Sequence, residues 1–248
     1  MAPPFTQPHV ESSPKRVRVL FGGTYIVDTT NAKLVWEHQY FPIYYFSSSD
    51  LSKQFLQQPS SSSTTKTNAD EKVYDLVVGS KRAESAVTEF TEGELKGLVR
   101  VKFSVAEAWF EEDEEIYNHP KDPYKRVDVL ASSRHIRIEY DGVELANTRR
   151  PRLLFETGFR VRTYIPKVDC KVELFENSDL TTQCPYKGIA NYYSVRLPSG
   201  SLAENIIWWY RTPQLECAEV KGCVAFYDEK VDVWVDGVKV ERPQTMLA

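Results

Sequence analysis

The sequence has few of the residues that build metal sites, membrane spans and nucleic-acid surfaces. Its 248 residues include four cysteines and four histidines, and no two cysteines form a C-x-x-C pair. Structural zinc sites take ligands from such pairs, so we expect no metal and no other cofactor. Lys and Arg total 31 against 35 Asp and Glu, which argues against a nucleic-acid partner. No apolar run approaches the roughly 20 residues of a membrane helix, so we expect no membrane partner.

A signal peptide is also missing from the start of the chain. The first residues, Met1-Ala2-Pro3-Pro4, contain neither the basic block nor the apolar block of a secretion signal. Disulfides belong to oxidising compartments, so we expect reduced thiols and a cytoplasmic protein. The sequence leaves open whether the chain forms an oligomer.

Methionine and glycine are scarce, with 2 and 11 residues, whereas aromatic residues make up 12% and tyrosine alone numbers 14. Aromatic residues favour strands, because they suit a pleated and half-buried surface. Alternating apolar residues flank Asp141-Gly142 and Asp236-Gly237, and this pattern predicts a β-hairpin at each site. Only two short helices are expected, at residues 169–176 after the cap Asp169 and at residues 51–58 after its counterpart Asp50.

The chain contains two diverged copies of one unit. Residues 17–51 align with residues 136–170 without a gap at an offset of 119, and seven of the 35 positions are identical. A second block follows at an offset of 125, where Lys96-Gly97-Leu98-Val99 matches Lys221-Gly222-Cys223-Val224 and Trp109 falls on Trp234. Matched blocks in the same order predict an internal duplication of a unit of about 110 residues.

The duplication predicts the organisation of the chain. We expect a first repeat over residues 15–130, a second over residues 131–243, and loose tails at 1–14 and 244–248. A serine-rich stretch of the first repeat, at about 57–71, is too polar to pack and should be a mobile loop. The expected fold class is all-β, mainly antiparallel with few short helices, in two tandem domains built as small curved sheets or open barrels.

One segment of the second repeat has no equivalent in the first. It runs Thr182-Gln183-Cys184-Pro185-Tyr186-Lys187-Gly188 and places a thiol, a phenol and an ammonium around two residues that turn the backbone. The corresponding stretch of the first repeat is serine-rich. A functional site that needs this segment must therefore lie in the second domain, although a plain turn with a solvated lysine is the alternative.

With this segment the sequence resembles the domain-of-unknown-function family numbered 427. The resemblance rests on residues 152–158 (RLLFETG), 182–188 (TQCPYKG), 224–227 (VAFY) and 231–237 (VDVWVDG), and the first repeat matches only the outer blocks. It implies a β-rich fold of the Mss4-like or β-tent group, which also includes zinc-binding and sulfoxide-reducing domains. The zinc knuckles of those relatives are absent here, and no reaction carries over from the family.

The family is sometimes labelled nucleotidyltransferase-like, and the residues argue against that activity. Such enzymes need a Gly-Ser turn followed by two close carboxylates that hold magnesium. Gly79-Ser80 is present, but no suitable pair of acidic residues follows it. In Asp232-Val233-Trp234 a tryptophan stands where the second carboxylate would be required.

Candidate catalytic residues of the second domain are Glu156, Lys187, Tyr186 and Cys184. Glu156 could act as a general base, with Lys187 and Tyr186 stabilising developing negative charge and Cys184 as a nucleophile. Glu37 occupies the position of Glu156 in the first repeat, so a shared structural role, such as pairing with an arginine, is the alternative.

Candidate ligand-binding residues are an arginine and four aromatic residues of the predicted strands. Arg160 and Arg162 could form an anion-binding stripe with Tyr164 on one strand face, or this could simply be a face exposed to solvent. In the strand that contains Trp208, Trp209 and Tyr210, alternation places Trp208 and Tyr210 on one face and Trp209 on the other. Tyr192 could complete an apolar pocket, or these rings could belong to the core.

Three classes of function fit these residues. The first is a small-molecule-binding protein, or a metal-free enzyme using acid–base chemistry, with its site around Cys184–Gly188. The second is a protein-interaction module without catalysis, which presents strand edges or aromatic patches. The third is a thiol-dependent reductase, which requires Cys184 to be exposed beside a second thiol. The sequence identifies neither the ligand nor the reaction.

Overall fold

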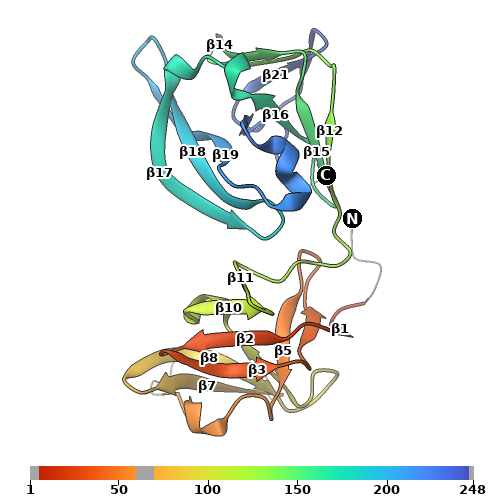
Figure 1. Cartoon of the computed structure of the whole chain (residues 1–248), viewed down its shortest axis with the longest axis vertical. Helices are drawn as coiled ribbons and strands as arrows, with labels where there is room; N and C mark the ends of the chain where they lie inside the picture. Colours follow the sequence, from red (N-terminus) through yellow and green to blue (C-terminus); the bar gives the residue numbers. More distant parts are fainter. Residues whose placement is uncertain (1–5, 60–69, 246–248) are drawn as a thin grey trace. The chain divides into compact units, whose positions relative to one another are not determined.

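The computed structural model describes residues 6–59 and 70–245 and separates into two compact units. One unit ends at Asp122 and the other begins at Pro123 (Figure 1). Within the described residues, each unit consists of antiparallel strands joined by loops and short 3-10 helices. None of these helices has the length and apolar character that crossing a bilayer requires.

The first unit contains a seven-stranded sheet, in the order β1-β4-β5-β9-β8-β7-β6, and a four-stranded sheet, in the order β11-β10-β2-β3. Its strands are β1 (His9–Ser12), β2 (Val17–Phe21), β3 (Thr24–Thr29), β4 (Lys33–Trp36), β5 (Ile43–Ser47), β6 (Leu56–Gln57), β7 (Glu71–Val78), β8 (Lys81–Phe90), β9 (Leu98–Val101), β10 (Ala108–Glu111) and β11 (Glu114–Ile116).

The second unit repeats this arrangement, with a seven-stranded sheet in the order β12-β15-β16-β20-β19-β18-β17 and a four-stranded sheet in the order β14-β13-β21-β22. Its strands are β12 (Val127–Ala131), β13 (Ile136–Tyr140), β14 (Val143–Thr148), β15 (Arg152–Glu156), β16 (Arg162–Pro166), β17 (Phe175–Cys184), β18 (Gly188–Arg196), β19 (Leu202–Tyr210), β20 (Cys223–Phe226), β21 (Asp232–Val235) and β22 (Val238–Val240).

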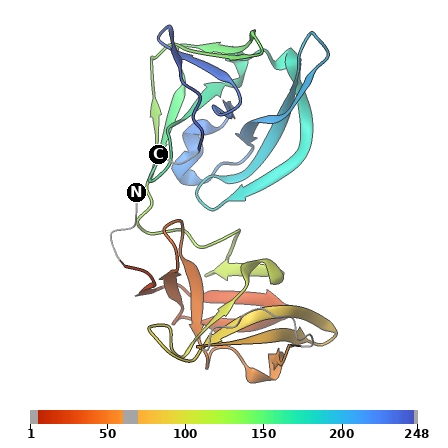
Figure 2. The same ribbon diagram turned by 180° about the vertical axis from the view of Figure 1, so that it is seen from behind.

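The two units correspond strand by strand, which confirms the predicted duplication and the all-β class. Figure 2 shows the units from behind, and in the second unit the long strands β17 and β18, drawn in cyan to light blue, curve around one side. Each copy folds as two sheets, and the described strands do not close into a barrel. The narrower prediction of a β-tent group stays a prediction.

The segments expected to be loose fall only partly on described residues. The serine-rich stretch expected at about 57–71 contains residues 60–69, which lie outside the described residues, and so do residues 246–248 of the C-terminal tail. The N-terminal tail expected at 1–14 contains a strand instead, because His9–Ser12 forms β1 and pairs with β4.

The boundary expected between residues 130 and 131 falls inside β12, one residue before the strand ends, and not ahead of the strand. β12 pairs with β15 in the second unit, Val127 opposite Glu156, just as β1 pairs with β4 in the first. Each copy therefore begins with this edge strand. The gapless match from residue 136 onward could not reveal it, because β12 lies upstream of that match.

The two predicted helices are wrong. The structure has a 3-10 turn, η1 (Lys53–Phe55), followed by β6 where the first helix was expected. At the second site it has two turns, η3 (Lys167–Asp169) and η4 (Val172–Leu174), after which β17 begins at Phe175.

The aspartates that should have capped these helices are engaged elsewhere. Thr29 Oγ1 donates a hydrogen bond to Asp50 Oδ2 at 3.0 Å, and Thr148 Oγ1 donates one to Asp169 Oδ2 at 2.7 Å. All four residues are among the identical positions of the repeat. Their identity therefore reflects a tie between a hairpin strand and the following loop that both copies share.

The predicted equivalence of Trp109 and Trp234 is also wrong. Trp234 stands opposite Arg137 in the pairing of β21 with β13, whereas Phe110 stands opposite Arg18, the counterpart of Arg137. A one-residue difference in the preceding loop makes the offset 124 at these strands. Trp109 lies in the core of the first copy, 2% exposed, and its true counterpart is Val233.

Both hairpins predicted from Asp-Gly are confirmed. Asp141 and Gly142 have φ of 48° and 77°, and Asp236 and Gly237 have φ of 52° and 87°. Positive φ at both central residues gives a turn whose twist matches that of the flanking strands. The first hairpin joins β13 to β14 and the second joins β21 to β22.

The larger sheet of the second copy packs on both faces. One face meets the smaller sheet through residues such as Ile165, Tyr193 and Ile207. The opposite face carries Tyr164 and Trp208 and is covered by η5 (Leu215–Val220), the blue coil between β12 and β17 in Figure 1. The candidate site residues belong to this second face.

Candidate functional site

The predicted ligand-binding aromatic residues come together in one row across the larger sheet. Tyr164 on β16 stands opposite Ala225 on β20, Ala225 opposite Trp208 on β19, and Trp208 opposite Tyr192 on β18. Tyr210 is two residues beyond Trp208 and so shares its face, as predicted. We call Tyr164, Tyr192, Trp208 and Tyr210 the aromatic face. Their exposed fractions are 7% or less.

Polar atoms of the aromatic face bond to one another and to the neighbouring strand β17. Trp208 Nε1 donates to Tyr164 Oη at 3.1 Å, and the two rings meet edge to face with centroids 6.2 Å apart. Tyr192 Oη shares a hydrogen bond of 2.8 Å with Thr182 Oγ1. Burial raises the pKa of Tyr164 and Tyr210 above its ordinary value, so both remain neutral phenols. This face therefore offers hydrogen-bonding hydroxyl groups but no charge of its own.

The charged groups at the edge of this face are the ion pair of Lys187 and Glu156. Lys187 Nζ donates a short hydrogen bond to Glu156 Oε2, and the two side chains are only 14% and 8% exposed. Cys184 Sγ lies 3.9 Å from the same ammonium. Burial alone would lower the pKa of Lys187, but attraction to Cys184 and Glu156 outweighs this effect and raises the pKa. Lys187 is therefore a fixed positive charge at neutral pH.

The turn that carries Lys187 is held against the segment that enters η5. Gln214 N donates to Lys187 O at 3.1 Å, and the thiol of Cys217 donates to Tyr186 O at 3.5 Å. Gly188 has φ of 101°, and a Cβ there would lie 3.0 Å from the carbonyl oxygen of Thr212. Only glycine fits both the backbone conformation and this close approach.

Replacing Gly188 by alanine is expected to lower the free energy of unfolding by about 2 kcal/mol, because the change adds a clash with Thr212 to an unfavourable φ. Gly200→Ala is the matched control, since Gly200 has φ of 89° and nothing within 4 Å of its Cβ position. The control should cost about 1 kcal/mol. Urea unfolding followed by circular dichroism measures both, and equal losses would contradict the close approach.

The remaining two candidate residues have other partners. Tyr186 is buried, and its ring centroid lies 5.5 Å from Lys125 Nζ, on which Phe159 also packs. Arg162 Nη1 donates to Asp228 at 3.1 Å, and its Nη2 donates to Glu229 at 2.6 Å. Two carboxylates thus already neutralise Arg162, which does not favour the anion-binding role expected for it.

Asp228 gives this ion cluster a pH dependence. Burial raises the pKa of Asp228 to about 6, against the smaller opposing effect of Arg162. The folded state then binds a proton that the unfolded state has released, so this group's contribution to stability falls as pH rises from 4 to 6. Between pH 4 and pH 7, the free energy of unfolding of the wild type should fall by about 2 kcal/mol more than that of Asp228→Asn. This figure allows for the remaining solvent exposure of the Asp228 carboxyl group. A constant difference across that pH range, measured by urea unfolding, would contradict this.

The first copy pairs its equivalent glutamate differently. Glu37 accepts hydrogen bonds from Arg100 Nη1 at 2.6 and 2.8 Å and another from Tyr45. Arg100 stands opposite Tyr45, in the place of Ala225 opposite Tyr164. Both copies thus pair this glutamate with a cation, which supports a shared role in the fold. Only the second copy supplies the cation from the segment Cys184–Gly188.

The family scan matches the chain twice, at residues 9–112 and 128–237, with the model described as a domain of unknown function, DUF427. The chain belongs to the DUF427 family. The matched segments hold one copy each of the repeated fold, in agreement with the resemblance noted from the sequence. A search of curated proteins found no match.

The two DUF427 copies differ on the aromatic face. The strand register places Thr88 where the second copy has Trp208. Thr88 stands opposite Arg100 of β9, and Trp208 stands opposite Ala225 of β20, the counterpart of Arg100. In the same way Val73 corresponds to Tyr192. The second copy therefore replaces a small polar and an aliphatic residue by two large aromatic residues beside the ion pair.

Three of the four cysteines of the second DUF427 copy are held in the thiol form by burial. Burial raises the pKa of Cys217 to about 11 and that of Cys170 to about 12, and it also raises the pKa of Cys223. These three groups are therefore thiols at neutral pH. Within residues 6–59 and 70–245, no three His, Cys, Asp or Glu residues are placed to hold a metal ion.

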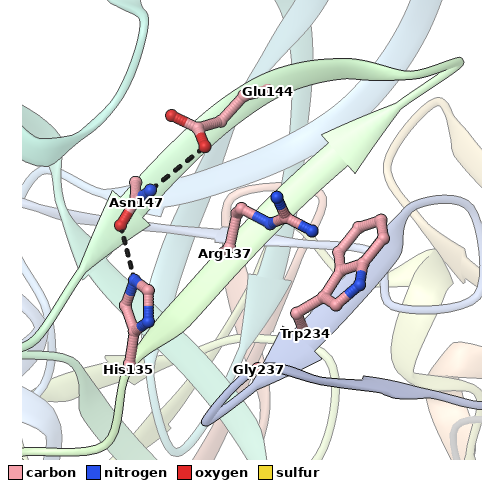
Figure 3. A pocket seen from close by; sticks show the side chains of 6 residues that line it. All are labelled: His135, Arg137, Glu144, Asn147, Trp234 and Gly237. Carbon is pink, nitrogen blue, oxygen red and sulfur yellow. Dashed lines mark hydrogen bonds between the residues drawn. The ribbon is translucent and has the colours of Figure 1, made fainter.

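A recess lies on the outer surface of the smaller sheet in the second DUF427 copy. Its volume is about 330 Å³. Arg137 lies over Trp234 with its guanidinium carbon 4.3 Å from the ring centroid (Figure 3). His135 Nε2 contacts Asn147 Oδ1 at 2.8 Å, and Asn147 Nδ2 donates to Glu144 at 3.0 Å. No sequence pattern marks this recess, because its residues come from β13, β14 and β21 and from the positions next to these strands.

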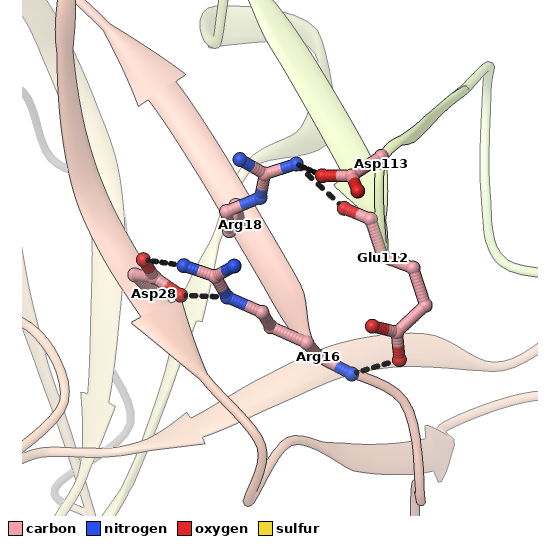
Figure 4. A network of polar contacts seen from close by, with 5 residues as sticks. All are labelled: Arg16, Arg18, Asp28, Glu112 and Asp113. Carbon is pink, nitrogen blue, oxygen red and sulfur yellow. Dashed lines mark hydrogen bonds and ion pairs between the residues drawn. The ribbon is translucent and has the colours of Figure 1, made fainter.

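The first copy closes the equivalent surface with carboxylates. Arg16 donates to both oxygens of Asp28 at 2.6 and 2.5 Å, and Arg18 donates to Asp113 at 2.8 Å and to the carbonyl of Glu112 (Figure 4). In the first copy, each of these two arginines is thus paired with an aspartate.

Two participants in the aromatic face were missed by sequence reasoning. Tyr227 lies with its ring centroid 4.8 Å from that of Trp208, and Cys217 of η5 is packed against the aromatic face. Alternation from Ala225 could have placed Tyr227 on this face. No comparable signal exists for Cys217, because its position depends on how the loop before β20 folds back.

Proposed function

We propose that the second DUF427 copy binds a small planar molecule with a carbonyl or carboxylate oxygen at the edge of its aromatic face. The single observation that carries the proposal is the nearly buried ion pair of Lys187 and Glu156 beside neutral aromatic rings. Binding sites typically combine apolar aromatic walls with a few placed polar groups. Lys187 would bind the ligand oxygen, and η5, which covers the buried rings of the aromatic face, would have to move for these rings to contact the plane of the ligand.

Stability alone accounts poorly for this ion pair. Removing two charges from water costs about as much free energy as their attraction returns, so a buried pair adds little net stability. The first copy achieves the same glutamate pairing with more exposed partners, Glu37 and Arg100, each 28% exposed. A more deeply buried lysine in the second copy therefore suggests selection for a use beyond folding.

An acid–base reaction is the enzymatic form of the proposal. The raised pKa of Lys187 keeps it protonated, so it would stabilise negative charge that develops on a carbonyl oxygen. Glu156, hydrogen-bonded to that ammonium, would accept the proton removed from the substrate. Binding without reaction uses the same contacts and is the simpler form.

The test uses benzoate and nicotinamide as oxygen-bearing planar probes and toluene as the probe without oxygen, with binding followed by ligand-detected NMR. Wild type should bind benzoate or nicotinamide but not toluene, and Lys187→Met should weaken binding at least tenfold. Lys221→Met, which removes an exposed lysine of the same copy, is the control and should bind as wild type. Equal binding by wild type and Lys187→Met would overturn the proposal, and so would no binding of either oxygen-bearing probe.

Thiol labelling tests the reductase alternative. Iodoacetamide should modify Cys184 first, because it is half-buried while Cys217 and Cys223 are buried and the pKa of Cys170 is about 12. Lys187→Met removes the charge 3.9 Å from the sulfur and should slow labelling severalfold. Peptide mass spectrometry of the labelled protein gives the order. Fast labelling of Cys184 together with a second cysteine would favour a reductase.

A further inference from the structure

The second copy contains a cavity on the opposite side of its larger sheet from the aromatic face. Its volume is about 440 Å³, and it lies between the two sheets. Apolar side chains dominate its lining, among them Leu153, Phe155, Val233, Val235 and Val240. Leu153 and Phe155 alternate along β15 with Leu154 and Glu156, so the cavity is separate from the site proposed above.

The first copy fills the same space with large side chains. The repeat offsets place Trp36 at the position of Phe155, Tyr44 at Thr163 and Trp109 at Val233. All three are at most 2% exposed and rank among the largest fully buried side chains of the chain. The first copy therefore fills this space, whereas the second copy leaves a half-open recess there beside its buried core.

In the first copy, polar contacts cover the space that corresponds to the cavity. Tyr44 Oη donates to Glu111 Oε1 at 2.9 Å, and Lys15 forms an ion pair with the same carboxylate. The second copy has Thr163 at the position of Tyr44 and Val235 at that of Glu111, so neither contact can form. Three smaller residues and the loss of this polar closure together open the cavity.

Three arginines and two acidic residues are among the polar lining of the cavity. Arg134, Arg160 and Arg242 line it together with Asp228 and Glu241. Arg134 and Arg242 are each about half exposed and keep donors beyond the single contacts that they make with Asp236 and Asp232. A guanidinium can bind a further carboxylate through its planar donors.

We propose that this cavity binds an amphiphile with an aliphatic chain and an anionic head, such as a free fatty acid. The chain occupies the apolar space between the sheets, and the carboxylate lies at the arginines of the mouth. An apolar cavity favours such a ligand, since each buried methylene tightens binding by about fourfold. The proposal is independent of the function proposed for the aromatic face.

Isothermal titration with octanoate, decanoate and dodecanoate tests the proposal. We expect saturable 1:1 binding that tightens by about fourfold per methylene, and weaker binding of 1-dodecanol than of dodecanoate. Thr163→Tyr/Val233→Trp restores the residues of the first copy and should abolish dodecanoate binding. Glu156→Gln/Lys187→Met should leave it unchanged, which separates failure of this proposal from failure of the proposed function.

A second variant keeps the test valid if the filled variant fails to fold. Val240 is 45% exposed at the mouth, so Val240→Glu should fold normally, repel the carboxylate and weaken dodecanoate binding more than tenfold. No saturable binding, or undiminished binding by both variants, would overturn the proposal. Equal affinity for dodecanol and dodecanoate would overturn the anionic head. Light scattering that detects a dimer abolished by filling the cavity would assign the space to a second copy of the chain.

Discussion

Replacing Lys187 by methionine is expected to lower the free energy of unfolding by about 4 kcal/mol. The change leaves the Glu156 carboxylate, 8% exposed, without its cation and beside apolar rings. Removing one partner of a buried ion pair typically costs 3–5 kcal/mol, because the remaining charge stays desolvated. Urea unfolding followed by circular dichroism measures the loss.

The double variant Glu156→Gln/Lys187→Met should recover most of this loss and unfold within about 1 kcal/mol of wild type, since neither side chain then carries a charge. Arg100→Met is the matched control in the first copy. Its pair with Glu37 is more exposed, and the loss there should be only about 1 kcal/mol. The single variant Glu156→Gln completes the comparison. If the double variant lost as much free energy of unfolding as Lys187→Met and Glu156→Gln lose together, the account of a coupled buried pair would be contradicted.

Replacing Trp109 by valine, the residue of the second copy, is expected to cost about 4 kcal/mol of unfolding free energy. Trp109 is 2% exposed, stacks on Phe103 at 4.8 Å and donates from Nε1 to the carbonyl of Phe103 at 3.0 Å. Loss of a buried tryptophan combines lost transfer free energy with a new cavity. Calorimetry of the full chain measures the change.

The reverse exchange, Val233→Trp, should change stability by less than about 1.5 kcal/mol, because the second copy already contains the space that the indole needs. The contrast between the two exchanges is the informative quantity. Similar large losses for both would mean that Val233 is tightly packed and that the two interiors are filled to the same degree.

Local chemistry made the hairpins and the duplication predictable from the sequence. Asp141-Gly142 and Asp236-Gly237 combine alternating strands with residues that accept positive φ, and both turns form. The helix predicted after Asp169 failed because a capping aspartate cannot be told from one that bonds a threonine 21 residues earlier. That distinction depends on a contact between distant segments.

In the candidate site too, local residue patterns were predictable and contacts between distant segments were not. The segment Cys184–Gly188 was identified by its residue types and its presence in one copy, and Lys187 does pair with the candidate Glu156. The role expected for Arg162 could not be judged, since its neutralisation by Asp228 and Glu229 requires β16 and the turn after β20 to lie together. The sequence contained no information on that approach.

The cavity was hidden from the sequence by a shift of one residue. With Trp109 aligned to Trp234, both copies seemed to hold a tryptophan in the same place. The strand register instead matches Trp109 with Val233, which turns an apparent identity into a large difference in volume. A gapless alignment cannot detect a shift that lies within a loop.

Mass spectrometry of small molecules released from the purified chain tests the central claim most directly. The protein is exposed to a cell lysate, repurified under native conditions and denatured, and wild type is compared with Glu156→Gln/Lys187→Met. The account predicts a compound with a carbonyl or carboxylate oxygen that wild type retains in stoichiometric amount and the double variant lacks at equal stability. The same compounds in both samples, or none in wild type, would contradict it.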